Sequence, residues 1–319
     1  SAASTGDLTI KAATTTGGIN GIVAKNYGTG ALSITTTGTT TGGTSGYGIY
    51  ANNSSAGTGL TINAAETEGD YSGIFAQHFG TGALSITTTG NTTSTKYFGI
   101  HAKNSSAGAS LTINAATTTG GINGIVAKNY GSGALSITTT GATTGGTGGD
   151  GIDAYNRISG TGLTINAATT TGGDDGINAH NMGSGALSIT TTGTTTGGTY
   201  GIKAANSGTG ALSITTTGTT TGTSSDGIRA FNSSAGTSLT INAATTTGGD
   251  DGIFAANSGT GALSITTTGT TTGDNDGIDA YNSSAGTSLT INAATTTGGD
   301  DGIVALNYGS GALSITTTG

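Results

Sequence analysis

The residues best suited to binding a cation in this sequence are aspartates that stand one repeat apart. Asp226, Asp251, Asp276 and Asp301 each directly precede the Gly of a Gly-Ile-x-Ala motif. If neighbouring repeats stack, these carboxylates lie at adjacent levels, where like charges repel. Either the turn directs them into solvent, since Asp is common in turns for backbone reasons, or a cation such as Ca²⁺ bridges them. The Gly-Gly-x-Gly-x-Asp nonapeptide of calcium-binding β-rolls is absent, so we expect no required cofactor, with Ca²⁺ as the candidate ion.

Catalytic chemistry has less support in the sequence. The three His residues, at positions 78, 101 and 180, belong to different repeats, and none stands beside a special cluster. An active site on a repeat scaffold combines unlike acids and bases at one place. The chain has no Cys, which excludes disulfides and thiolate metal sites. We therefore expect that the protein is not an enzyme.

An Asn recurs two residues beyond the Ala of Gly-Ile-x-Ala, in eleven of twelve repeats. These residues are Asn26, Asn53, Asn104, Asn129, Asn156, Asn181, Asn206, Asn232, Asn257, Asn282 and Asn307. The exception is His78. The parity of the strand directs this side chain inward, where stacked amides can bond to each other and to the backbone of the turn. The pattern predicts a structural Asn ladder in which His78 occupies one level.

Aromatic residues are confined to one window of the repeat, around the Gly-Ile-x-Ala motif. The candidate binding residues are those at its outward positions: Tyr50, Phe75, Tyr155, Phe231, Phe254 and Tyr281. We expect these side chains to be exposed, and a stripe of exposed aromatics more often marks a contact surface than an accident. The partner is left open between a glycan, a host protein, and other copies of the chain packed laterally or end to end.

The elements that position these residues follow from two motifs. Leu-x-Ile occurs thirteen times at spacings of 24 to 28 residues, with Gly-Ile-x-Ala between the copies. Both motifs alternate apolar and polar residues with a period of two, which is typical of β-strands, and Pro is absent. The pattern predicts an all-β fold, a parallel β-helix (β-solenoid) of about 13 coils of 24–28 residues. We expect one repeat domain over residues 1–319, as a segment of a longer repeat protein.

Charge and hydropathy limit the partners. The net charge is −8, and the Lys and Arg residues form no basic stripe of the kind that binds nucleic acid. No apolar run approaches the length of a membrane span. We therefore expect neither nucleic-acid binding nor membrane insertion.

The repeat Gly-Thr-Gly-Ala-Leu-Ser-Ile-Thr-Thr-Thr-Gly, followed by Gly-Ile-x-Ala-x-Asn, resembles the β-helical passenger repeats of Gram-negative autotransporters and haemagglutinin-like adhesins. The resemblance covers essentially the whole chain. It implies a right-handed β-helix and an extracellular location at the bacterial surface. The function it implies is that of a structural or adhesive rod or fibre.

The Thr-rich face supports an alternative function, ice binding. Flat Thr arrays on solenoids suit this role, and Ser33, Thr35 and Thr37 recur in half of the coils. The other coils place Thr61, Asn63 and Ala65 at these positions, which interrupts the array at every second level.

Overall fold

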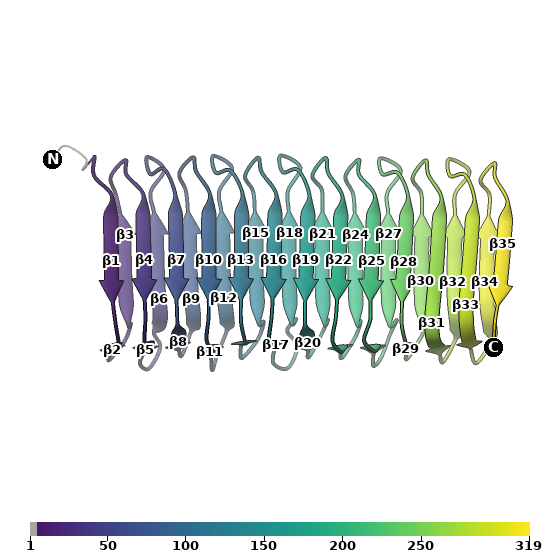
Figure 1. Cartoon of the computed structure of the whole chain (residues 1–319), viewed down its shortest axis with the longest axis horizontal. Coiled ribbons are helices and arrows are strands. Elements are labelled where there is room, and N and C mark those ends of the chain that lie inside the picture. The colour runs from purple at the N-terminus through teal and green to yellow at the C-terminus, as the bar shows by residue number, and fades with distance from the viewer. Residues whose placement is uncertain (1–4) are drawn as a thin grey trace. The chain divides into compact units, whose positions relative to one another are not determined.

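The computed structural model describes residues 5–319, and every regular element in that range is a β-strand. The chain is an all-β parallel β-solenoid of about 12 turns, as the two repeated motifs predict (Figure 1). It divides into two compact units, one ending at Thr161 and the other spanning Gly162–Gly319. In each unit a coil consists of a Leu-x-Ile strand, a short Thr-rich strand and a Gly-Ile strand.

The first unit contains six strands of each kind within its described part. The Leu-x-Ile strands are β1 (Leu8–Ala12), β4 (Leu32–Thr36), β7 (Leu60–Ala64), β10 (Leu84–Thr88), β13 (Leu111–Ala115) and β16 (Leu135–Thr139). The short strands are β2 (Thr15–Gly17), β5 (Thr39–Gly42), β8 (Glu66–Gly69), β11 (Thr92–Ser94), β14 (Thr118–Thr119) and β17 (Ala142–Thr144). The Gly-Ile strands are β3 (Ile22–Asn26), β6 (Tyr47–Asn53), β9 (Ser72–His78), β12 (Phe98–Asn104), β15 (Ile125–Asn129) and β18 (Ile152–Asn156).

The second unit repeats this order, except that two of its Leu-x-Ile strands run on through the position of the short strand. The Leu-x-Ile strands are β19 (Leu163–Ala167), β22 (Leu187–Thr191), β25 (Leu212–Thr216), β28 (Leu239–Ala243), β31 (Leu263–Gly273), β33 (Leu289–Thr297) and β35 (Leu313–Thr317). The separate short strands are β20 (Thr169–Gly172), β23 (Thr195–Gly197), β26 (Thr220–Gly222) and β29 (Thr246–Gly248). The Gly-Ile strands are β21 (Ile177–Asn181), β24 (Ile202–Asn206), β27 (Ile228–Asn232), β30 (Ile253–Asn257), β32 (Asp276–Asn282) and β34 (Asp301–Asn307).

Within each unit, equivalent strands of neighbouring coils pair in parallel and in register. In the first unit Leu84 lies between Leu60 and Leu111, and Ile86 lies between Ile62 and Ile113. Identical side chains therefore repeat at about 4.8 Å, the spacing of paired strands. A slip of one residue would turn every Leu and Ile to the outer face, so the apolar pattern itself fixes the register.

The core is a stack of these inward Leu, Ile and Ala side chains. Leu84, Ile86, Ile100 and Ala102 are all fully buried. Burial of one Leu or Ile side chain contributes roughly 1.5–3 kcal/mol. Because each coil covers the apolar edge of the next, this stabilisation comes from stacking rather than from any single coil.

The short strands supply a third inward column, which is made of Thr. In the first unit Thr40, Thr67, Thr92, Thr118 and Thr143 are buried at 0–1% exposure. The methyl groups of these Thr residues explain why the Gly-Ile-x-Ala motif of the preceding coil has Gly at its first position. A Cβ at Gly99 would lie within 3 Å of both the Thr118 Cγ2 and the Gly124 carbonyl oxygen. Only Gly permits the Gly-Ile segment of one coil to approach the following coil this closely.

Candidate functional site

The Gly-Ile strands carry the residues that vary between coils. In β12 the inward side chains are Ile100, Ala102 and Asn104, whereas His101 and Lys103 alternate with them on the outer face. Neighbouring strands keep this register, so His101 pairs with Phe75 and Lys103 pairs with Gln77. Two outward columns result, and their residues differ from one coil to the next while the inward ones stay almost constant.

Seven rings form one aromatic cluster on this face of the first unit, over β6, β9 and β12 and the turns before them. The members are Tyr47, Tyr50, Tyr71, Phe75, Tyr97, Phe98 and His101. The Tyr50 and Phe75 rings are stacked, with centroids 5.3 Å apart and an interplanar angle of 10°. The His101 ring lies edge-on to both Phe75 and Phe98, at 5.0 Å from each. Rings at these separations gain about 0.5–1.5 kcal/mol per pair beyond the area that they bury.

The six predicted binding aromatics all lie on this outward face, but they differ in exposure. Phe231 and Tyr281 are exposed, at 36% and 38%. Tyr50, Phe75, Tyr155 and Phe254 are half-buried. Rings on adjacent coils cover them: Tyr50 and Phe75 cover each other, Tyr130 lies 6.1 Å from Tyr155, and Phe231 lies 5.3 Å from Phe254. The structure brings Tyr50 and Phe75 together within the first unit, and Phe231 and Phe254 together within the second.

A groove lined by Thr, Gly and charged residues adjoins the aromatic cluster along the short strands. It has a volume of about 650 Å³, and its wall includes Glu68, Asp70 and Lys96. Lys96 Nζ lies 2.7 Å from Asp70 Oδ2 and 5.3 Å from the centre of the Tyr71 ring. Hydrogen bonds from Lys96, Thr95 and the Ser45 amide to its carboxylate lower the pKa of Asp70 to about 2. Asp70 is thus a fixed anion at the edge of the cluster.

The His101 imidazole is held neutral within the cluster. Burial lowers its pKa to about 4, and the nearby Lys128 and Lys103 ammonium groups act in the same direction. A neutral His behaves here as one more aromatic ring. This accounts for the outward His101 in packing terms.

The Asn column forms hydrogen-bonded ladders in both units. Asn26 Nδ2 donates to Asn53 Oδ1 at 2.8 Å, and Asn129 Nδ2 donates to Asn156 Oδ1 at 2.9 Å. In the second unit the same bond links each residue of one series to the next: Asn181, Asn206, Asn232, Asn257, Asn282 and Asn307. Ladder amides also donate to carbonyls of the turn that follows them: Asn26 Nδ2 donates to Gly30 O at 2.7 Å, and Asn257 Nδ2 donates to Gly261 O at 3.0 Å. These bonds satisfy buried polar groups at the corners of the coils that they join.

His78 stands in the column at its predicted level but interrupts the bonding. Asn53 Nδ2 lies 3.2 Å from His78 Nδ1, which therefore accepts. On the other side Asn104 Oδ1 is buried and has no hydrogen-bond partner among the described residues. Burial lowers the pKa of His78, against a smaller opposing effect of the Gly82 carbonyl. The ladder of the first unit is consequently split into two segments.

The predicted Ca²⁺ ligands also lie in register, but they bond to the backbone. Asp226, Asp251 and Asp276 are buried and Asp301 is exposed. Asp251 Oδ1 accepts the Asp276 amide at 3.1 Å, and Asp276 Oδ1 accepts the Asp301 amide at 3.1 Å. Asp226 also accepts a hydrogen bond from Arg229 Nη1 at 2.8 Å. The carboxylates of Asp226, Asp251 and Asp276 thus each accept a backbone amide in the turn of the following coil.

A tighter group of acids exists in the same turns. Asp226, Asp250 and Asp251 can place one carboxylate oxygen each within 4.8 Å of one another, without Asp276 or Asp301. Burial raises the pKa of Asp251 to about 6, opposed by the bond from the Asp276 amide and reinforced by the neighbouring Asp226, Asp250 and Asp276. Burial likewise raises the pKa of Asp226, opposed by Arg229. The arrangement offers oxygen ligands of the type Ca²⁺ takes, although the backbone already uses part of their capacity.

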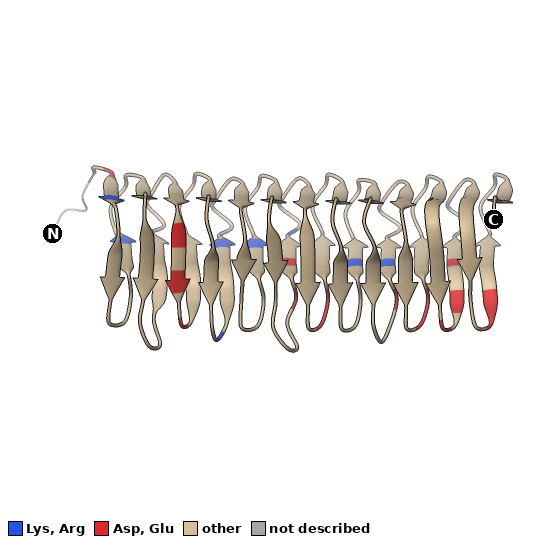
Figure 2. Ribbon diagram, turned by 60° about the horizontal axis from the view of Figure 1, so that its bottom comes forward, with Lys and Arg blue, Asp and Glu red and all other residues tan. Residues whose placement is uncertain are grey.

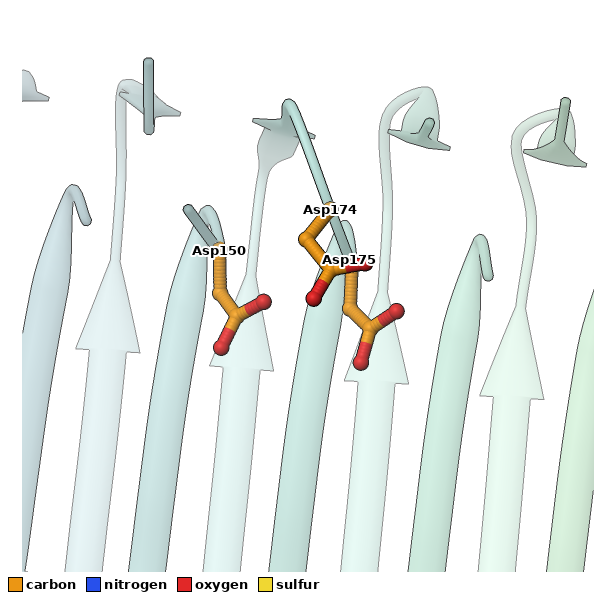
Figure 3. A group of neighbouring side chains, drawn as sticks. All are labelled: Asp150, Asp174 and Asp175. Atoms are coloured by element: carbon orange, nitrogen blue, oxygen red, sulfur yellow. The ribbon is translucent and has the colours of Figure 1, made fainter. Parts of the chain in front are cut away.

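Acidic residues mark the corresponding turns elsewhere (Figure 2). In the second unit Asp174 and Asp175 follow β20 (Figure 3). Asp174 Oδ1 accepts from the Thr199 hydroxyl at 2.6 Å, and Asp175 Oδ1 accepts from the Tyr200 amide at 3.3 Å. The inner Asp of the pair again bonds to the backbone of the next coil, while the outer one faces solvent.

No family model, curated protein or solved structure gives a significant match to the chain. Within residues 5–319, no helix is long and apolar enough to cross a membrane. Any functional assignment must therefore come from the solenoid and from its variable face.

Proposed function

We propose that this chain is an extracellular structural or adhesive β-solenoid of a bacterial surface, of the autotransporter-passenger or haemagglutinin-like type. Contact with a partner would be made through the outward face of its Gly-Ile strands. In this proposal the partner is a second copy of the chain or a surface glycan or protein, and the protein has no enzymatic role. The resemblance implies a right-handed solenoid. Secretion to the Gram-negative surface is part of the same proposal.

The observation that carries the proposal is the seven-ring aromatic cluster of the first unit. A constant core needs no aromatic residue, and the other outward positions of the coils carry mainly Ser, Thr and Asn. Large rings are nevertheless gathered on one face, and Tyr97 there is 43% exposed. Aromatic side chains are enriched where proteins make contacts.

The test replaces Tyr50 and Phe75 together by Asn, a residue that the chain itself carries at the equivalent outward position, Asn178. We expect loss of self-association by light scattering, or loss of adherence by bacteria that display the chain, with unchanged circular dichroism. The matched control is Thr87→Asn on β10, between Asn63 and Asn114 in register. Equal association and adherence of the double variant and the control would contradict the proposal.

Ice binding is the second candidate, and one observation favours it. In the first unit an outward column of hydroxyls runs without a gap through Thr9, Ser33, Thr61, Ser85, Thr112 and Ser136. The neighbouring column alternates, with Thr35 beside Asn63 and Thr87 beside Asn114. A thermal hysteresis assay separates the candidates, because an adhesive solenoid leaves the freezing point of its solution unchanged.

A further inference from the structure

Three of the eight cationic residues of this acidic chain gather around one ring of the first unit, Tyr130. Lys103 Nζ and Arg157 Cζ each lie 5.4 Å from the Tyr130 ring centroid. Lys128 pairs in register with Lys103 and, with Tyr130 and Arg157, lines an adjoining groove. The chain as a whole has a net charge of −8, whereas this turn carries a local excess of positive charge.

The backbone of the turn after the Asn ladder assembles this group from distant parts of the sequence. The Ser105 amide donates to His78 O, the Tyr130 amide to Asn104 O, and the Arg157 amide to Asn129 O, each at 2.9 Å. Ser105, Tyr130 and Arg157 therefore occupy the same position of three successive coils. Sequence reasoning missed the group because its members are about one repeat apart. Lys103 and Lys128 look like ordinary outward strand residues, and Tyr130 and Arg157 look like isolated turn residues.

The group lines a groove of about 300 Å³, at the small end of the range for ligand pockets. Its walls are formed by Phe79, Lys103, Ser105, Ser106, Tyr130 and Arg157. In the part of the chain that the structure describes, neither Lys103 nor Arg157 has a carboxylate within ion-pair distance. Lys128 has one, Asp153, at 4.0 Å. Two cations therefore face the groove without an internal counter-charge.

The chemistry of the walls identifies the kind of ligand. A guanidinium group binds a carboxylate or a sulfate with two parallel hydrogen bonds, and an ammonium group adds a point charge. Contact with the Tyr130 ring restrains both cations, which leaves this ring a poor platform for a nucleobase. Phe79, 37% exposed, instead offers an apolar surface to the C–H face of a sugar ring.

We propose that the Lys103–Tyr130–Arg157 turn binds an anionic sugar unit of a polysaccharide through its carboxylate or sulfate group. Lys103 shares the outward face of the Gly-Ile strands with the contact surface proposed above, but Tyr130 and Arg157 lie in turns beyond those strands, and the site contains none of the seven rings of the aromatic cluster. It can hold when that proposal fails.

The experiment is isothermal titration calorimetry of the purified chain with three oligosaccharides. Oligogalacturonate carries carboxylates alone, a chondroitin sulfate tetrasaccharide carries carboxylates and sulfates, and maltotetraose is neutral. We expect binding of one or both anionic probes and none of maltotetraose. Comparison of the two anionic probes identifies whether the carboxylate suffices or sulfate is needed. Raising the salt concentration weakens the binding, because the cations are solvent-accessible.

Variants connect the binding to the turn. Arg157→Gln and Lys103→Gln each weaken it by about tenfold or more, the cost of one charge-assisted hydrogen bond. The matched control is Lys25→Gln, because Lys25 holds the same strand position in β3 as Lys103 holds in β12. The Tyr50→Asn/Phe75→Asn variant retains full binding if the two surfaces are separate.

Three results would overturn the inference. They are an absence of binding to both anionic probes, equal binding of maltotetraose, and equal losses in Lys25→Gln and Arg157→Gln. Binding of a single-stranded oligonucleotide in place of both sugars, with the same dependence on Arg157, would assign the turn to nucleic acid and would equally refute it.

Discussion

Replacing His78 by Asn should make the first unit more stable. Residues 78–84 read His-Phe-Gly-Thr-Gly-Ala-Leu, and residues 26–32 read Asn-Tyr-Gly-Thr-Gly-Ala-Leu. The turn at residues 26–32 shows which hydrogen bonds an Asn makes in this context. Asn26 Oδ1 accepts the Gly28 amide at 3.0 Å, and its Nδ2 donates to Gly30 O and to the next ladder residue.

An Asn at position 78 would therefore donate to Gly82 O and to Asn104 Oδ1, and would accept the Gly80 amide. Asn104 Oδ1 is the buried acceptor that lacks a partner among the described residues, and such a group costs about 1–3 kcal/mol. Loss of the larger imidazole offsets part of this gain through weaker packing. We expect a net increase of about 1–2 kcal/mol in the free energy of unfolding at neutral pH.

The pH dependence provides a second signature of the same substitution. Burial lowers the pKa of His78 below its ordinary value of 6.5. The folded state then binds the proton less readily than the unfolded state, so wild-type stability falls as the pH drops below about 6.5. His78→Asn removes this loss, so its advantage over the wild type should be larger at pH 5 than at pH 7.5.

The assay is equilibrium urea denaturation followed by far-ultraviolet circular dichroism, with hydrogen exchange of the peptides around β9 as a local readout. The control is the reverse change, Asn129→His, which removes the bonds from Nδ2 to Gly133 O and Asn156 Oδ1, both at 2.9 Å, and should destabilise. If His78→Asn left both the unfolding free energy and the exchange around β9 unchanged or lowered, the reasoning from the unpaired Asn104 oxygen would be wrong.

Three further predictions concern single buried groups. Thr118→Val should raise the free energy of unfolding by about 1 kcal/mol in urea denaturation, because the buried Thr118 hydroxyl has no partner among the described residues. The control, Thr246→Val, loses a hydrogen bond to Thr271 at 3.3 Å and should show no such gain. His101→Phe should flatten the fall of stability between pH 6.5 and 4. The wild type should lose about 2–3 kcal/mol of unfolding free energy over this range, because a His with its pKa lowered to about 4 destabilises the fold as it is protonated. An unchanged pH profile in the variant would refute the neutral state of His101. Asp251→Asn should stabilise the fold by about 2–3 kcal/mol at pH 7.5, because the raised pKa of about 6 means that ionised Asp251 costs stability above that pH. The gain should vanish as the pH falls towards 4. A gain that persists at pH 4 would point to a cause other than ionisation.

The solenoid itself could be predicted from the sequence because the register of each coil depends on residues that repeat. Leu-x-Ile and Gly-Ile-x-Ala place every inward Leu, Ile, Ala and Asn, and the paired strands follow that alignment. The short Thr strands were harder to predict from the sequence. Thr is so abundant around Thr92 and Thr118 that the inward residue has no distinct type, and only the clash with a Cβ at Gly73 or Gly99 reveals it.

The sites were predictable to a smaller extent. The Asp column of the second unit could be aligned from sequence, but the hydrogen bond that the Asp276 amide donates to Asp251 depends on a turn geometry that spacing does not specify. The exposure of Phe75 depends on which rings stand in the coils above and below it. The cation group around Tyr130 depends on the same neighbour relation at a turn, where alternation along a strand gives no information.

The direction of the Asn ladders has a consequence for how such a chain changes in length. In the ladder bonds that join two Asn residues, Nδ2 of one coil donates to Oδ1 of the coil that follows it in the sequence. Each Asn coil thus presents an acceptor to its predecessor and a donor to its successor, and any two such coils are compatible as neighbours. A recombination event that duplicates or deletes one whole repeat rejoins matching ends, so the gene can lengthen or shorten the protein in steps of one coil. The level of His78 is where this interchangeability stops, because Asn104 Oδ1 in the coil after it receives no donor from the described residues.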